Sequence, residues 1–213
     1  MAIIKLGILG PLHGKVGPII GTTWKDVAVI KAQAQSYNDR QSQAQLTQRM
    51  NMKLTMLFLR PLKEFIRIGY KDYEKNMSAF NAATSQILKN AIVGSYPEIS
   101  VNCSRALLSK GILTPVFEAF ADHDNGKITI KWNDNSNINL AKPTDVAMPV
   151  AYNLTKSQAI FKADVECCRS DERLDITFPS DWKTDTVAIY LSFIDLWCDR
   201  ISNSVFVDTI ILS

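Results

Sequence analysis

The segment Asn125-Gly-Lys-Ile-Thr-Ile-Lys-Trp132 decides the fold class of this chain. Its apolar residues Ile128, Ile130 and Trp132 occupy every second position, which is typical of a β-strand with one buried face. The Asn125-Gly126 pair is a strong signal for a two-residue hairpin turn, so a partner strand should precede it. Trp132 resembles the core tryptophan of immunoglobulin-type sandwiches. The segment therefore predicts a strand of an antiparallel β-hairpin.

The alternating pattern extends over the rest of the C-terminal half. Turn residues separate short stretches that are rich in β-branched and aromatic residues. Seven such strands in roughly 110 residues are typical of a sandwich of the immunoglobulin or fibronectin type. We therefore predict an immunoglobulin-like β-sandwich over residues 101–213. The expected strands lie near residues 113–121, 127–132, 145–153, 157–164, 172–178, 185–194 and 204–212.

The region before residue 100 shows helical periodicity. Ser42-Gln43-Ala44-Gln45 fits a capping box, so a helix should begin there. Pro61 either kinks this helix or begins a second one. Ser78 opens another helical stretch, which Gly94 as a C-terminal cap and Pro97 should end. The apolar stripe of the first stretch comprises Leu46, Met50, Leu54, Leu57 and Phe58.

Residues 7–33 are rich in glycine and β-branched residues, with a turn signal at Lys25-Asp26, which predicts one or two short β-hairpins. The stretch Gly10 to Val16 also resembles a nucleotide-binding loop. Three residues separate its glycines instead of four, and Val16 stands where such a loop needs serine or threonine.

The predicted fold class is α+β, with hairpins and a helical hairpin in residues 1–100 followed by the sandwich.

The two halves carry opposite charge. Residues 1–100 hold 13 Lys and Arg against 6 Asp and Glu, a net charge of +7, whereas residues 101–213 hold 11 against 15, a net charge of −4. Such asymmetry is expected where a basic region docks onto an acidic surface, including that of an identical neighbour, or binds nucleic acid. The expected interaction residues are Trp24, Lys25, Arg49, Lys53, Arg60, Arg67 and Lys71.

Nucleic acid is not the partner that we expect first. The basic residues of the helical region recur at spacings of three, four or seven, which also describes a solvated helix face. The chain has no arginine cluster, glycine-arginine repeat or RNA-recognition signature.

We expect no catalytic residues, metal or cofactor. The sequence has no G-x-S-x-G elbow and no H-E-x-x-H, and its histidines are His13 and His123. No pair of its cysteines forms C-x-x-C, and the run from Asp122 to Gly126 departs from the calcium-loop pattern. Cys167-Cys168 are read as strand residues, one of them buried, and a disulfide to Cys198 stays open.

We also predict that no segment spans a membrane, because no apolar run approaches roughly 20 residues. Met1 to Gly10 lacks the pattern of a secretory signal. The protein is thus expected in the cytoplasm on synthesis, with a later place in a virion, or outside the cell by a non-classical route, left open.

The chain contains a set of short motifs: Gly7 to Gly10, Gly14 to Gly17, Gly21, Trp24-Lys25, Ala44-Gln45 with Arg49, Phe80 to Ala83, Trp132, Asp134 to Ser136, Pro179 to Trp182 and Asn203 to Val205. Together they resemble an uncharacterised protein family of Bacteroidetes bacteria, which carries a domain-of-unknown-function label. The segment from Ser42 to Arg49 is similar, more locally, to small phage and prophage structural proteins, with serine in place of their threonine. The family resemblance implies a shared architecture and no site residues.

The leading functional hypothesis is a non-catalytic structural or assembly protein of a virion, tail-like particle or extracellular filament. It would associate through its N-terminal region and display the sandwich. The alternative is a binding module for a glycan or protein, with Trp182 or Trp197 as the ligand platform. A second alternative is a nucleic-acid binder that uses the basic helix stripe.

Overall fold

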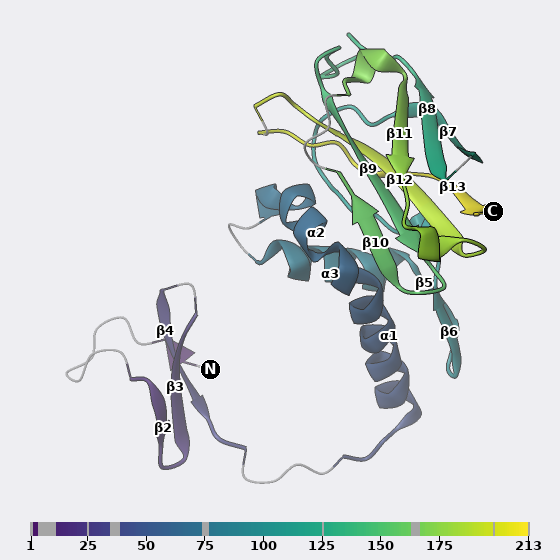
Figure 1. Cartoon of the computed structure of the whole chain (residues 1–213). Helices are drawn as coiled ribbons and strands as arrows, with labels where there is room; N and C mark the ends of the chain where they lie inside the picture. Colours follow the sequence, from purple (N-terminus) through teal and green to yellow (C-terminus); the bar gives the residue numbers. More distant parts are fainter. Residues whose placement is uncertain are drawn as a thin grey trace. The chain divides into compact units, whose positions relative to one another are not determined.

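The structure of the chain is a computed structural model, which describes residues 2–3, 12–24, 26–34, 39–73, 77–124, 126–162, 167–197 and 199–212. It is a mixed α+β fold, mostly of strands in several antiparallel sheets with one helical hairpin, so the α+β part of the prediction is confirmed (Figure 1). Contacts divide the chain into two compact units, Met1–Ser42 and Gln43–Ser213.

The first unit is one antiparallel sheet with the strand order β1-β4-β3-β2. Gly17 has a φ of +57° in the turn between β2 and β3, a conformation that glycine adopts without strain. Asp26 has a φ of +61° in the next turn, and its predicted turn partner Lys25 lies outside the described residues. The predicted hairpins are confirmed. The strands are β1 (Ala2–Ile3), β2 (Gly14–Val16), β3 (Ile19–Trp24) and β4 (Val27–Ala32).

The second unit begins with the helices, at the positions that the sequence indicates. Helix α1 (Gln43–Leu59) starts directly after Ser42. Pro61 lies in a short 3-10 turn, after which α2 (Lys63–Gly69) begins, so the proline separates two helices. Helix α3 (Ala79–Asn90) is capped by Ser78, whose Oγ accepts a hydrogen bond from the Asn81 amide at 3.2 Å.

The predicted end of the last helix at Gly94 is wrong. Helix α3 ends at Asn90 with Ala91 as its C-cap, and Gly94 lies in a hairpin of β5 (Ile92–Ser95) and β6 (Glu98–Val101). Gly94 does have a φ of +89°, but a Cβ there would meet the Glu98 carbonyl oxygen at 2.2 Å. The glycine therefore permits close strand pairing, a need that the sequence pattern does not separate from helix capping.

All seven predicted strands of the C-terminal half are present. They form a four-stranded antiparallel sheet with the order β10-β9-β12-β13 and a three-stranded one with the order β11-β8-β7. The strands are β7 (Phe117–Asp124), β8 (Lys127–Asn133), β9 (Val146–Asn153), β10 (Gln158–Phe161), β11 (Arg173–Thr177), β12 (Thr186–Ile194) and β13 (Val205–Ile211).

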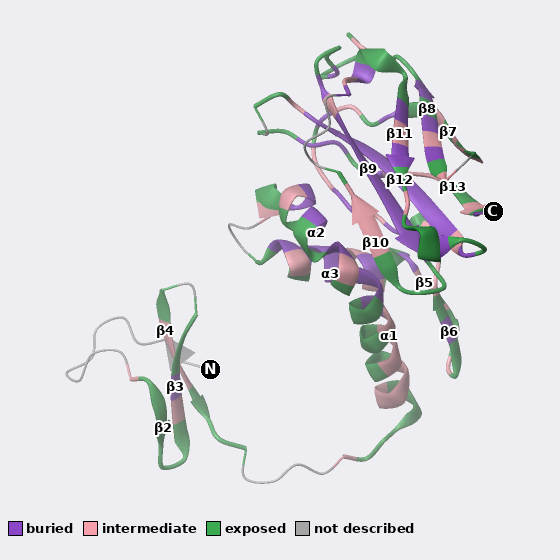
Figure 2. Cartoon of the chain, viewed as in Figure 1, coloured by how far each residue is buried: buried purple, intermediate pink, exposed green. Residues whose placement is uncertain are grey.

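The four-stranded sheet is the middle of three layers. Alternate residues of β12 enter different cores: Val187, Ile189 and neighbours face the three-stranded sheet, whereas Ala188 and Tyr190 face the helices. Strands β9 and β12 are buried along almost their whole length (Figure 2). Antiparallel sheets commonly leave one face in water, and this one does not.

This layering explains why the domain boundary is not the predicted one near residue 100. Phe58 of α1 stacks on Tyr152 of β9 with ring centroids 4.7 Å apart, and Phe65 of α2 meets Phe161 of β10 at 5.8 Å. Helices and strands therefore share one core. The change from helical to alternating period marks a change of secondary structure within one unit, and the boundary lies at Ser42 instead.

A buried ion pair lies in the core between the four-stranded and the three-stranded sheet. The Arg169 guanidinium is fully buried and lies 3.1 Å from the Asp145 carboxylate. It also donates to Asn135 and to the Thr114 carbonyl, and it covers the Phe193 ring at 3.9 Å. Because each of the three guanidinium nitrogens donates to an acceptor and the cation lies over a ring face, the arginine is held in an apolar core.

Candidate functional site

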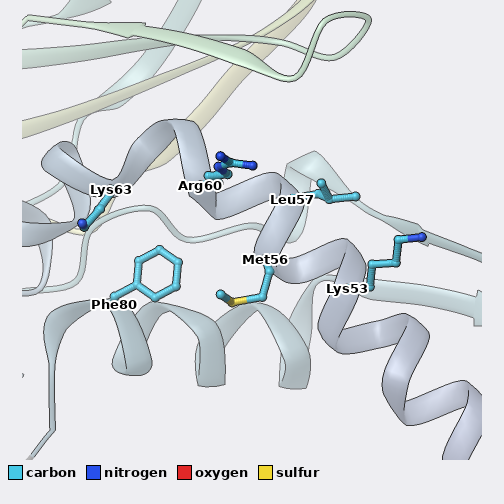
Figure 3. Close-up of a pocket in the computed structure, with 6 residues that line it drawn as sticks. All are labelled: Lys53, Met56, Leu57, Arg60, Lys63 and Phe80. Carbon is cyan, nitrogen blue, oxygen red and sulfur yellow. The ribbon is translucent and has the colours of Figure 1, made fainter.

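A groove on the helical layer is a candidate site. It is hollowed to about 280 Å³ where α1, α2 and α3 meet, and Figure 3 shows its lining side chains. We call it the basic groove. Its lining residues are Lys53, Met56, Leu57, Arg60, Lys63 and Phe80.

Helical geometry produces this composition. Positions 49, 52, 53, 56, 57 and 60 recur by three and four residues, so they form one face of α1 and the turn that follows it. Thr55, Phe58 and Leu59 lie on the opposite, buried face. Met56 and Leu57 are 40% and 47% exposed, which leaves apolar surface between cations. The predicted assignment of Leu57 to the core stripe is therefore wrong.

The charge of the groove is of one sign. Lys53, Arg60 and Lys63 surround the apolar floor, and the lining among the described residues contains no carboxylate. The nearby Glu64 is engaged instead by Arg67, at 3.2 Å on the exposed face of α2. The arrangement suits an apolar side chain that has a negative charge beside it, because burial strengthens the attraction between opposite charges.

The structure brings together only part of the predicted basic stripe. Arg49, Lys53, Arg60, Arg67 and Lys71 are all exposed, as an interaction surface requires. Of these, Lys53 and Arg60 line the groove. Sequence reasoning missed the apolar members Met56, Leu57 and Phe80, since their exposure depends on how closely α1 and α3 approach.

The N-terminal sheet is a second candidate surface. Trp24 is 57% exposed and pairs directly across the hairpin with Val27, which is 39% exposed. The third predicted residue of this region, Lys25, lies outside the described residues. Exposed apolar pairs on a sheet are uncommon without a partner surface.

The two predicted platform tryptophans differ completely in exposure. Trp182 is 1% exposed and its indole nitrogen donates to Gln158 at 3.0 Å, so it cannot offer a ring face to a ligand. It follows β11 in a 3-10 turn that closes over the core, where a large ring fills space. Trp197 is 79% exposed in the loop between β12 and β13. Only Trp197 therefore remains a platform candidate.

Burial raises the pKa of two of the described thiols, those of Cys103 and Cys167. Cys103, Cys167 and Cys168 form no disulfide with one another, and Cys198 lies outside the described residues. Cys167 is buried, as predicted for one of the adjacent pair, and burial raises the pKa of its thiol to about 12. A thiol that stays protonated at neutral pH is a poor nucleophile.

Among the described residues, no three His, Cys, Asp or Glu side chains lie close enough together to hold a metal ion. Within the same part of the chain, no helix combines the length and the apolar character needed to cross a membrane.

Comparison with known proteins places the chain in a family. The match covers residues 11–208, which include the N-terminal strands β2 to β4, the helices and almost all of the C-terminal strands. The comparison with curated proteins gave no match. The matching family is described as a family of unknown function, which agrees with the uncharacterised family expected from the sequence. The chain belongs to that family, DUF6266.

Proposed function

We propose that this protein is a non-catalytic structural or assembly protein, of a virion, tail-like particle or extracellular filament. It associates through its N-terminal region and displays a β-sandwich. The observation that carries the proposal is the N-terminal sheet, whose described strands expose apolar side chains on both faces.

The register of the hairpins gives the two faces. Residues directly opposite in an antiparallel pair project to the same side. Trp24 opposes Val27, and Ile19 opposes Val16. Ile19 and Trp24 both belong to β3 and are five positions apart, so their side chains project to opposite faces of the sheet. All four side chains are more than a third exposed.

A sheet of this kind needs another layer. Sheets are stable when an apolar face is buried against a second element, at roughly 25 cal/mol for each Å² removed from water. Among the described residues between 12 and 34, only Gly21 is buried, and glycine has no side chain to contribute to a core. A neighbouring copy, or another protein of the assembly, supplies the missing layer.

The strand order of residues 113–212 supports the displayed sandwich. When β7 to β13 are lettered A to G, strands A, B and E form one sheet and strands D, C, F and G form the other. Immunoglobulin constant domains have A, B, E and D against C, F and G. Only the fourth strand differs, since β10 pairs with β9, and we assign a fibronectin-like variant of the sandwich. Its outer three-stranded sheet and its loops are the parts left for display.

Light scattering on the full chain tests the assembly, over a concentration series and in rising salt. We expect a mass above that of one chain, which grows with concentration and persists in salt, because apolar contacts do not weaken on screening. The double variant Trp24→Lys/Val27→Lys should reduce the mass strongly. Ile112→Lys, which places a charge at an exposed apolar site of the second unit, is the matched control. A strict monomer at every salt and concentration would overturn the proposal.

A binding module is the second candidate, and the exposure of Trp197 favours it. A ring that is 79% exposed on a loop could stack on a sugar or a protein side chain. A glycan array with the full chain and Trp197→Ala is the test. Binding that Trp197→Ala abolishes supports the module, and an array without signal removes its carbohydrate version.

A further inference from the structure

The loop between β12 and β13 has the chemistry that the basic groove lacks. Leu196 and Trp197 are 60% and 79% exposed at its end, and Asp195 and Asp199 flank them. We call Asp195, Leu196, Trp197 and Asp199 the tryptophan tip. The tip is apolar with negative charge beside it, whereas the basic groove is apolar with positive charge around it.

The described part of this loop is held by its own hydrogen bonds. The Asp195 carboxylate accepts the amides of Asp199 at 2.7 Å and Arg200 at 3.1 Å, and the Asp195 amide donates to the Arg200 carbonyl at 3.0 Å. A bridge between Ile194 and Ile201 closes the base. The backbone at the base of the loop is thus held in place before any contact, which lowers the entropic cost of binding.

The groove provides the matching surface. Met56, Leu57 and Phe80 form an apolar floor for an indole ring, and Arg60 or Lys53 at its rim can stack on that ring. The remaining cations can pair with Asp195 and Asp199. A buried tryptophan surrounded by a charged rim is the usual form of a strong interface contact.

We propose that the tryptophan tip of one chain inserts into the basic groove of a second copy. Tip and groove belong to the same compact unit, and Figure 1 shows the β12–β13 loop well apart from α1, so a chain does not fill its own groove. A contact between two different patches repeats from copy to copy, and it builds open filaments or closed rings. This inference rests on the proposed assembly function and names one of its interfaces.

Zero-length cross-linking of isotope-mixed protein tests the contact. Unlabelled and ¹⁵N-labelled full-length chains are mixed equally, treated with a carbodiimide that joins amines to carboxylates in direct contact, and digested for mass spectrometry. We expect cross-links of mixed isotope between Lys53 or Lys63 and Asp195 or Asp199. Trp197→Ser should weaken this contact about 30-fold or more and remove the cross-links.

Complementary variants show which chain of a cross-linked pair supplies the tip and which supplies the groove. In a mixture of ¹⁵N-labelled Trp197→Ser and unlabelled Arg60→Glu, only the intact tip of the second can enter the intact groove of the first. The cross-link should therefore join a labelled lysine to an unlabelled aspartate and never the reverse. Ile138→Ser and Arg105→Glu, at exposed sites outside tip and groove, are the matched controls and should leave the cross-links unchanged.

Two failures are distinguishable. If light scattering finds the wild-type chain assembled but no mixed-isotope cross-link joins tip and groove, this inference falls and the assembly function stands. If the wild-type chain is monomeric throughout, both fall. Cross-links that persist in Trp197→Ser would also overturn the inference.

Discussion

The chain contains two four-stranded antiparallel sheets with opposite surroundings. The sheet β10-β9-β12-β13 lies between helices and a second sheet, and its two inner strands are buried on both faces. The described strands of the sheet β1-β4-β3-β2 expose apolar residues on both faces. The first sheet thus lies at the centre of a folded unit, whereas the second is the surface that we propose for association. The comparison separates the source of stability from the proposed source of association.

Removal of the buried arginine should have the largest effect on the second unit. Arg169→Ala leaves Asp145 charged and unpaired in the core, so we expect the free energy of unfolding to fall by about 3–5 kcal/mol. Urea denaturation measures it. Arg173→Ala is the matched control, because its ion pair with Asp175 is exposed and should contribute about 1 kcal/mol or less. Equal losses in the two variants would contradict a closed core.

Truncation of Phe65 tests whether helices and sandwich unfold together. The ring is fully buried against Phe161 of the middle sheet, so Phe65→Ala should destabilise the unit by about 3–5 kcal/mol. The helical circular dichroism signal and the fluorescence of the buried tryptophans should still be lost in one transition. Leu57→Ala, at a half-exposed site of α1, should change stability little. Helices that melt first would restore a domain boundary near residue 100.

Substitution of two glycines distinguishes the destabilisation caused by a steric clash from that caused by backbone conformation alone. Gly94→Ala adds a Cβ 2.2 Å from the Glu98 carbonyl oxygen at a φ of +89°, and we expect a loss of about 2–3 kcal/mol. Gly126→Ala has a similar φ of +77° with open space around the new carbon, so only the conformational part, about 1 kcal/mol, should be lost. Thermal unfolding of both variants measures the difference, and equal losses would contradict the pairing of β5 with β6.

Acid sensitivity should also reside in the second unit. A hydrogen bond from Asn153 at 2.7 Å and the ion pair with Lys156 lower the pKa of Asp185. Because the folded pKa lies below the unfolded value of about 3.9, this stabilisation is present above that pH and is lost as pH falls through the folded pKa. Asp185→Asn should make the unfolding free energy fall less steeply below about pH 4. An unchanged slope would contradict this role.

Local sequence signals predicted most of the elements, because each rests on neighbouring residues. The hairpin at Gly126, the helix start after Ser42 and the seven C-terminal strands needed no tertiary information. Three features did need it. The first is the covering of the middle sheet: Tyr152 and Tyr190 lie against helices, and alternation alone does not say what covers a face. The second is Trp182, which is buried by the fold around it. The third is the basic groove, which requires Phe80 of α3 to lie beside α1.

Hydrogen exchange at two protein concentrations tests the contrast between the sheets most directly. At low concentration we predict fast exchange for amides of residues 14–32 and slow exchange for residues 146–153 and 186–194, because only the latter strands are covered by other layers. At high concentration, residues 14–32 should become protected, while the middle sheet stays unchanged. Protection of residues 14–32 that is equally strong at both concentrations, in a chain that stays monomeric, would contradict the account.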